Sequence, residues 1–146
     1  MTILDAYAVI GCLRGEAAAE EVVPLLRVGD ARLTAVGVAE VIDHLVRLAG
    51  IDEEEAVPDL AQLGVLEGIA IDSAAGAAAG RLRGRHYHRK RCAVSMADCL
   101  AAQTARVTSR SLATSDPHLL DLCHGEGIST TVLPGSDGSR WAAPES

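Results

Sequence analysis

The stretch TILDAYAVIGCLRG, residues 2–15, is the part of the sequence on which the fold assignment depends. TILD is predicted to be a short strand that leads directly into a helix over residues 6–15, ended by Gly15. Asp5 stands in the middle of this apolar segment, where an unpaired buried charge would cost several kcal/mol. We therefore expect Asp5 to cap the helix, to meet a cation, or to lie at a surface where a charge is useful.

Strand and helix patterns alternate along the rest of the chain. Strands are expected at 31–34, 67–71, 111–114 and 128–133, and helices at 16–29 (with a break at Pro24), 36–50, within 52–63, and at 73–80, 95–107 and 117–127. The helices are long enough to serve as the crossovers that parallel strands need. The sequence therefore predicts an α/β sandwich, with a mostly parallel central sheet flanked by helices.

Composition limits the class of protein. The 146 residues favour one domain over residues 1–134, followed by a polar, disordered tail at 135–146. The formal charge of −7 argues against a nucleic-acid binder that relies on its overall positive potential. The four cysteines show no zinc or disulfide spacing and are expected to be free thiols, and no apolar run is long enough for a membrane span. We expect a cytoplasmic protein.

Four acids stand out by position. Asp5 and Asp116 follow predicted strands, at the end of a parallel sheet where ligands bind, whereas Glu40 and Asp98 lie on helices. Each also has a local explanation: Asp5 and Asp116 could be N-caps, Asp98 could close a capping box, and Glu40 could be solvated. Asp72 follows IAI in the same manner as Asp5, so the local pattern by itself is weak.

Taken together, the four acids indicate a metal site. Clustered carboxylates raise one another's pKa unless a cation balances them. Mg²⁺ or Mn²⁺ suits oxygen ligands of this kind, and phosphodiester hydrolysis is the chemistry that such a site supports. No HExxH motif supports zinc, and no phosphate-binding glycine loop is present.

Four blocks of the chain resemble a PIN domain, and specifically a VapC-type toxin of a toxin–antitoxin pair. The blocks are ILDAYAVIGCL, LTAVGVAEVIDHLVR, SMADCLAAQTA and LATSDPHLL, at residues 3–13, 33–47, 95–105 and 112–120. The resemblance implies a three-layer sandwich and a ribonuclease whose catalytic, metal-binding acids are Asp5, Glu40, Asp98 and Asp116. It also implies that Thr114 is a supporting hydroxyl. Glu40 is preferred to Asp43, one helical turn away, which is expected to lie behind the ligands or at the surface.

A basic segment precedes Asp98. RLRGRHYHRKR, residues 81–91, holds six of the thirteen Lys and Arg residues and offers RNA a local positive path. Tyr87 could stack on an unpaired base. The residues expected to bind RNA are Arg85, Tyr87, Arg89, Lys90 and Arg91. The alternative is a solvated loop or helix end without a partner.

The leading hypothesis is a Mg²⁺- or Mn²⁺-dependent endoribonuclease toxin. The resemblance implies that a cognate VapB-like antitoxin silences it and that it forms a homodimer. Two alternatives stay open: a PIN-type nuclease that processes nucleic acid without a toxin role, and a non-catalytic α/β interaction module whose acids only cap helices.

Overall fold

The computed structural model describes residues 1–145, and its centre is a four-stranded sheet. The strands are β1 (Thr2–Leu4), β2 (Ala31–Arg32), β3 (Ser111–Thr114) and β4 (Thr130–Val132), in the order β2-β1-β3-β4. Every pairing is parallel. β1 and β3 are therefore the inner strands, and their carboxyl ends lie side by side.

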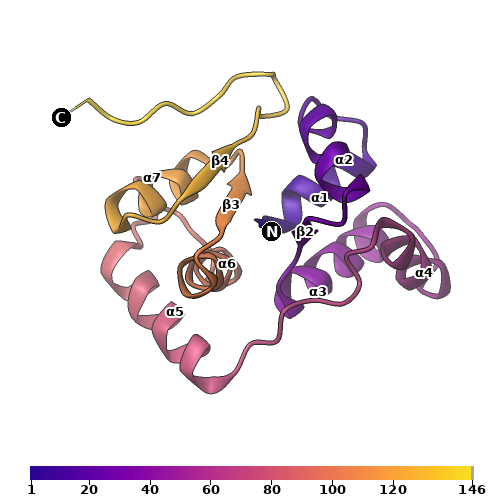
Figure 1. Cartoon of the computed structure of the whole chain (residues 1–146), viewed down its shortest axis with the longest axis horizontal. Coiled ribbons are helices and arrows are strands. Elements are labelled where there is room, and N and C mark those ends of the chain that lie inside the picture. The colour runs from indigo at the N-terminus through magenta and orange to yellow at the C-terminus, as the bar shows by residue number, and fades with distance from the viewer. Residues whose placement is uncertain (146) are drawn as a thin grey trace.

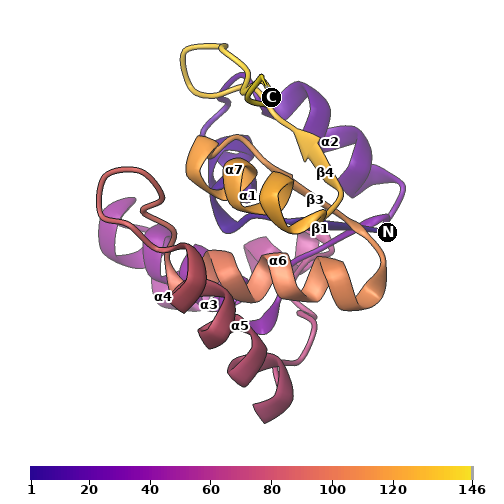
Figure 2. The ribbon, with the colours of Figure 1, turned by 90° about the vertical axis from the view of Figure 1, so that its left-hand side faces the viewer.

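Helices cover both faces of this sheet (Figure 1). One side carries the early elements α1 (Ala6–Leu13), α2 (Ala19–Arg27), α3 (Ala35–Asp43), the π-helical segment η1 (His44–Leu48) and α4 (Glu53–Leu63). The other side carries α5 (Ser73–His86), α6 (Met96–Thr108) and α7 (Pro117–Glu126). Figure 2 shows α5 lying across α6.

Two apolar clusters fill the space between the layers, and strand alternation separates them. Leu4 and its register neighbour Ala113 belong to the cluster beneath α1–α4. Ile3 and its neighbour Leu112 belong to the cluster beneath α5–α7. Because successive strand residues point to opposite faces, Ile3 and Leu4 of β1 serve one core each. The predicted three-layer α/β sandwich is confirmed.

The prediction of a strand at 67–71 is wrong. Only Ile69 pairs, through a single parallel bridge to Thr34. The N–H of Gly68 turns back to the carbonyl of Leu66 at 3.0 Å and so does not join a ladder. The chain also crosses closely here, because a Cβ on Gly68 would lie 2.9 Å from backbone atoms of Ala35. The sheet ends at β2.

Two helices also differ from their expected form. The helix expected over 36–50 changes to π geometry at His44, where the N–H of Ala49 donates to the His44 carbonyl five residues earlier. The helix expected at 73–80 continues to His86, so that half of the basic segment is helical. Hydrophobic periodicity predicts neither the π-helical segment nor the longer α5, because neither feature depends on which residues are apolar.

The C-terminal residues contact the domain at two points. Arg140 forms an ion pair with Glu21, at 2.7 Å between Nη2 and Oε2, and Trp141 Nε1 donates to Asp121 at 2.8 Å. The disorder expected for residues 135–146 stays a prediction, and Ser146 lies outside the described residues. Among the described helices, none has the length and apolar character to cross a membrane. All four cysteines are free.

Candidate active site

Asp5 occupies the carboxyl end of β1 and caps the helix that follows. Its Oδ1 accepts a hydrogen bond from the backbone N–H of Tyr7 at 3.3 Å. Its Oδ2 accepts one from the hydroxyl of Thr114, the last residue of β3, at 2.7 Å. Only 7% of Asp5 is exposed. The carboxylate is thus fixed at both oxygens, at the carboxyl ends of the two inner strands.

The environment of Asp5 opposes its charge. Burial raises the pKa of Asp5 from 3.8 to about 7, and the nearby charge of Asp98 adds to the increase. The bonds from Thr114 and Tyr7 lower this pKa, and Asp116 raises it slightly. Two donors therefore do not compensate for a buried carboxylate that faces other carboxylates.

Asp98 is positioned by a capping box at the start of α6. The backbone N–H of Asp98 donates to Ser95 Oγ at 3.0 Å, and Asp98 Oδ2 accepts from the Ser95 N–H at 2.9 Å. Burial raises the pKa of Asp98, the Ser95 bonds lower it, and the charge of Asp116 raises it. The local motif thus holds the side chain at the helix end while its charge interacts with the other acids.

Asp116 caps α7 and is linked to Asp5 through one hydroxyl. Its backbone N–H donates to Thr114 Oγ1 at 3.1 Å, and that hydroxyl donates onward to Asp5. Its Oδ1 accepts from the N–H of His118 at 2.8 Å. Thr114, fully buried, therefore links the ends of β1 and β3, binding the carboxylate of Asp5 and the backbone of Asp116.

Glu40 faces the same cluster from the middle of α3. It is half-buried, and burial and the charge of Asp98 raise its pKa. Asp43, the nearby alternative, is exposed and binds Arg47 with both oxygens, at 3.1 and 3.0 Å. The charge of Asp98 thus reaches Glu40, whereas Asp43 is engaged in a surface ion pair.

The four acids named from the sequence thus gather at the carboxyl ends of the inner strands. Asp98 raises the pKa of both Asp5 and Glu40, and Asp116 raises that of Asp5 and Asp98. Asp5 and Asp116 are also N-caps, and Asp98 completes the capping box of α6. Capping and clustering are therefore both present, and capping does not account for the mutual repulsion.

The donor set suits a hard divalent cation. Within residues 1–145, no three His, Cys, Asp or Glu side chains stand in an arrangement that could hold a metal ion directly. Mg²⁺ commonly takes one or two carboxylates and keeps several waters, so it does not require a closed protein cage. Four carboxylates whose charges repel one another offer oxygen ligands that suit such an ion.

Comparison with protein families decides the assignment of the fold. The family model of the PIN domain matches residues 2–125. The chain belongs to the PIN domain family. Members of this family are nucleases that generally use divalent metals. No curated protein sequence matches the chain.

Several solved structures share the fold of this PIN domain. FitAcB from Neisseria gonorrhoeae is 19% identical, with a TM-score of 0.64 over 89% of this chain and 96% of that chain. FitAB bound to an IR36 DNA fragment is 21% identical, with a TM-score of 0.67 over 90% and 94%. VapBC2 from Rickettsia felis, bound to a DNA fragment from its promoter, is 15% identical, with a TM-score of 0.59 over 89% and 96%. At these identities the likeness shows the fold.

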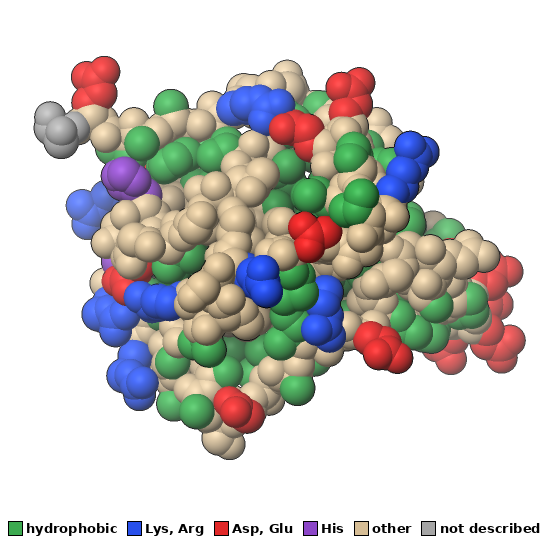
Figure 3. All heavy atoms as spheres, in the orientation of Figure 1, with side chains coloured by type: hydrophobic (Ala, Val, Ile, Leu, Met, Phe, Trp, Pro, Cys, Tyr) green, Lys and Arg blue, Asp and Glu red, His purple; other side chains and the backbone are tan. Residues whose placement is uncertain are grey.

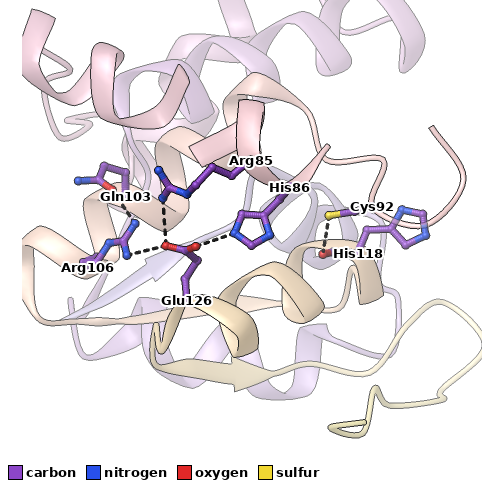
Figure 4. Close-up of polar contacts among 7 residues, drawn as sticks. All are labelled: Arg85, His86, Cys92, Gln103, Arg106, His118 and Glu126. Carbon is purple, nitrogen blue, oxygen red and sulfur yellow. Dashed lines mark hydrogen bonds and ion pairs between the residues drawn. The ribbon is translucent and has the colours of Figure 1, made fainter. Parts of the chain in front are cut away.

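The basic segment of the PIN domain divides into two environments. Arg85 points to Glu126 on α7, which also accepts from Arg106 at 2.9 Å and lies 2.6 Å from His86 Nε2 (Figure 4). The bonds from His86, Arg106 and Arg85 lower the pKa of Glu126 to about 2. Arg85 is therefore engaged in an ion-pair network between α5, α6 and α7.

The remaining predicted RNA-binding residues lie in and beside the turn after α5. His88 Nδ1 accepts from the N–H groups of Lys90 and Arg91, at 3.2 and 3.1 Å. This turn leaves Arg89, Lys90 and Arg91 exposed. Tyr87 is 46% exposed, and the guanidinium carbon of Arg83 lies 4.2 Å from the centre of its ring.

Arg83 is a residue that the sequence reading did not single out. Its Nε donates to the carbonyl of Val94 at 2.9 Å, and its charge partly offsets the rise that burial causes in the pKa of Asp98. The signal was its i, i+4 spacing to Tyr87, which becomes informative only when the helix is known to extend to His86.

Proposed function

We propose that this PIN domain is a Mg²⁺- or Mn²⁺-dependent endoribonuclease and the toxin of a toxin–antitoxin pair. One observation carries the nuclease proposal: Asp5, Glu40, Asp98 and Asp116 converge at the carboxyl ends of β1 and β3, where burial and mutual repulsion raise the pKa of three of them. A fold that maintains such a cluster pays for it in stability, which a bound cation would restore.

The roles of the residues follow from their contacts. Asp5, Asp98, Asp116 and Glu40 would hold the cation, which when bound activates a water and stabilises the charge that develops on the phosphate. Thr114 orients Asp5 through its hydroxyl and receives the backbone N–H of Asp116. The capping box with Ser95 fixes the orientation of the Asp98 side chain in the first turn of α6.

The surface charges support an RNA substrate. Lys and Arg side chains gather over the α5 side of the molecule, whereas acidic side chains gather over α4 at the opposite end (Figure 3). The exposed Arg89, Lys90 and Arg91 lie on the turn between α5 and α6, the helix that begins two residues before Asp98. An acidic protein can thus still guide a phosphate backbone towards its acids.

The toxin role and its partners rest on the VapC-like motifs. We infer a cognate VapB-like antitoxin, a homodimer and a cytoplasmic site of action. A hollow of about 510 Å³ between α1, η1 and α4 supports a protein partner, because apolar side chains such as Leu13 and Leu48 are exposed beside it. Among the fold neighbours, VapBC2 is described with a DNA fragment from its promoter.

The nuclease proposal is tested with a pair of matched substitutions. Asp98→Asn removes the charge of a helix-capping acid inside the cluster, and Asp72→Asn does so at the N-cap of α5, where the side chain accepts only from Ala75. With Mg²⁺ or Mn²⁺ and structured RNA, the wild type and Asp72→Asn should cleave at equal rates. Asp98→Asn should lose roughly 100-fold or more, as expected when a group that supports transition-state charge is removed.

Two results would overturn this proposal. Equal cleavage by Asp98→Asn and the wild type would show that the acids only cap helices. No cleavage by the wild type with either metal would favour the interaction module. The toxin role has its own test, in which expression of the chain arrests growth and co-expression of a small neighbouring reading frame relieves it. Cleavage without growth arrest would favour a processing nuclease.

A further inference from the structure

A hollow of about 290 Å³ lies where the end of α5 crosses the start of α6. Its lining is Gly80, Arg83, Gly84 and Tyr87 from α5, and Met96 from α6. Its volume is close to the lower end of the range for small-molecule sites. The lining contains no acidic residue, although the chain as a whole carries a formal charge of −7.

Two glycines create this space. Gly80 and Gly84 are four residues apart and therefore share one face of α5. A Cβ built on either of them meets no atom within 4 Å, so the hollow is open directly above the helix backbone. Glycine in a helix interior costs about 1 kcal/mol relative to alanine, and here it leaves room for a flat ligand.

The other three residues supply the chemistry that recognises a nucleobase. The Arg83 guanidinium lies over the Tyr87 ring and is held from its edge by the Val94 carbonyl, so it is a flat cation already fixed in place. Tyr87 and Met96 are 46% and 47% exposed. Bases stack on aromatic rings and on guanidinium planes, and a thioether makes favourable contacts with aromatic systems.

The hollow adjoins the acid cluster. Met96 is the first residue of α6, and Asp98 is the third. Arg83, which lines the hollow, also donates to the carbonyl of Val94, the residue directly before the Ser95 that caps α6 and bonds to Asp98. A strand whose phosphate faces Asp98 would therefore carry a neighbouring nucleotide at the Arg83–Tyr87 pair.

We propose that this hollow binds an unpaired base of the RNA strand, next to the phosphodiester that the acids face. The proposal rests on the proposed nuclease function and adds to it the place on the α5–α6 surface where the base is held. A base inside a duplex is already stacked and cannot enter the hollow, and stacking alone tolerates any base.

The test fills the hollow without disturbing the acids. Gly84→Leu places a side chain in it, and Gly76→Leu is the matched control, because Gly76 lies on the same helix, has equally open space around it and does not line the hollow. Both changes replace a helical glycine with a better helix former. Binding of a fluorescein-labelled single-stranded RNA is followed by anisotropy in EDTA, so that no cleavage occurs.

Gly84→Leu and Tyr87→Ala should each weaken RNA binding by roughly 10-fold or more, within the range measured for base stacking. Gly76→Leu should stay within about 2-fold of the wild type, by the usual size of surface effects. An RNA with 2-aminopurine should change its fluorescence on binding the wild type but not Gly84→Leu.

The subsite is refuted if Gly84→Leu binds as tightly as Gly76→Leu, if duplex RNA binds as tightly as single strands, or if the wild type does not bind RNA. These outcomes are separate from the nuclease test. Cleavage by the wild type together with unaltered binding by Gly84→Leu would remove the subsite and leave the nuclease. Binding that depends on Gly84, without cleavage in Mg²⁺ or Mn²⁺, would do the reverse.

Discussion

Replacing Asp5 with asparagine should make the metal-free protein more stable. In the folded chain the pKa of Asp5 is about 7, against 3.8 for the free side chain. A difference of about three pKa units corresponds to roughly 4 kcal/mol. Structural relaxation and water entry reduce the penalty of a buried charge, so we expect Asp5→Asn to gain about 1–3 kcal/mol at pH 8.

The sign of the pH dependence follows from the direction of this shift. A carboxyl whose folded pKa is raised holds its proton in the folded state after the unfolded chain has lost it. Its contribution to stability is therefore complete below about pH 4 and is lost as the pH rises through about 7. Asparagine does not titrate, so the variant should lack this decline.

Urea or thermal unfolding in EDTA at pH 5 and pH 8 measures the effect. A gain of this size should raise the melting temperature by about 5 °C at pH 8. Asp72→Asn is again the control, since Asn and Asp are equally good N-caps and Asp72 is exposed. Added Mg²⁺ should stabilise the wild type more than Asp5→Asn. Asp5→Asn being less stable than the wild type at pH 8 would refute the argument.

Three further substitutions test separate features. Glu126→Gln should lower the free energy of unfolding by about 1–2 kcal/mol at neutral pH, because water around the exposed arginines screens much of the ion-pair energy. Since the pKa of Glu126 is lowered to about 2, this difference in unfolding free energy should vanish as the pH falls from about 4.5 to 2. Gly68→Ala should cost about 1–3 kcal/mol in chemical denaturation, because its Cβ would meet the Ala35 backbone at 2.9 Å, and no loss would show that the crossing can relax. Thr114→Val removes the donor to Asp5 and should slow RNA cleavage by roughly 10-fold or more without unfolding the chain, and an unchanged rate would show that the hydroxyl does not orient the acid.

The strands and the acids were accessible from the sequence because their signals are local. A short apolar run followed by an acid and a helical pattern predicts both the strand and its carboxyl end, directly before Asp5 and one residue before Asp116. The capping box at Ser95 and Asp98 is likewise a local motif. Convergence of the acids at one edge then follows from parallel pairing, because carboxyl ends of parallel strands lie on the same side of a sheet.

The missed features depend on contacts between distant segments. Gly68 lies against the backbone of Ala35, and Arg85 forms its ion pair with Glu126, 41 residues away. Neither partner can be identified from spacing along the chain. The Arg83–Tyr87 pair required the true end of α5, and element ends are where sequence patterns carry least information.

The capping roles of three acids have a consequence for how a lineage of such proteins would lose its activity. Asp5 and Asp116 are N-caps and Asp98 completes the capping box of α6, so their replacement by most residues would also weaken folding. Glu40, in the middle of α3, makes no side-chain hydrogen bond within residues 1–145. Descendants released from selection for cleavage should therefore lose Glu40 first and keep the three aspartates, because the fold needs them. In such a descendant, an intact set of aspartates would be a record of folding requirements and a poor guide to catalysis.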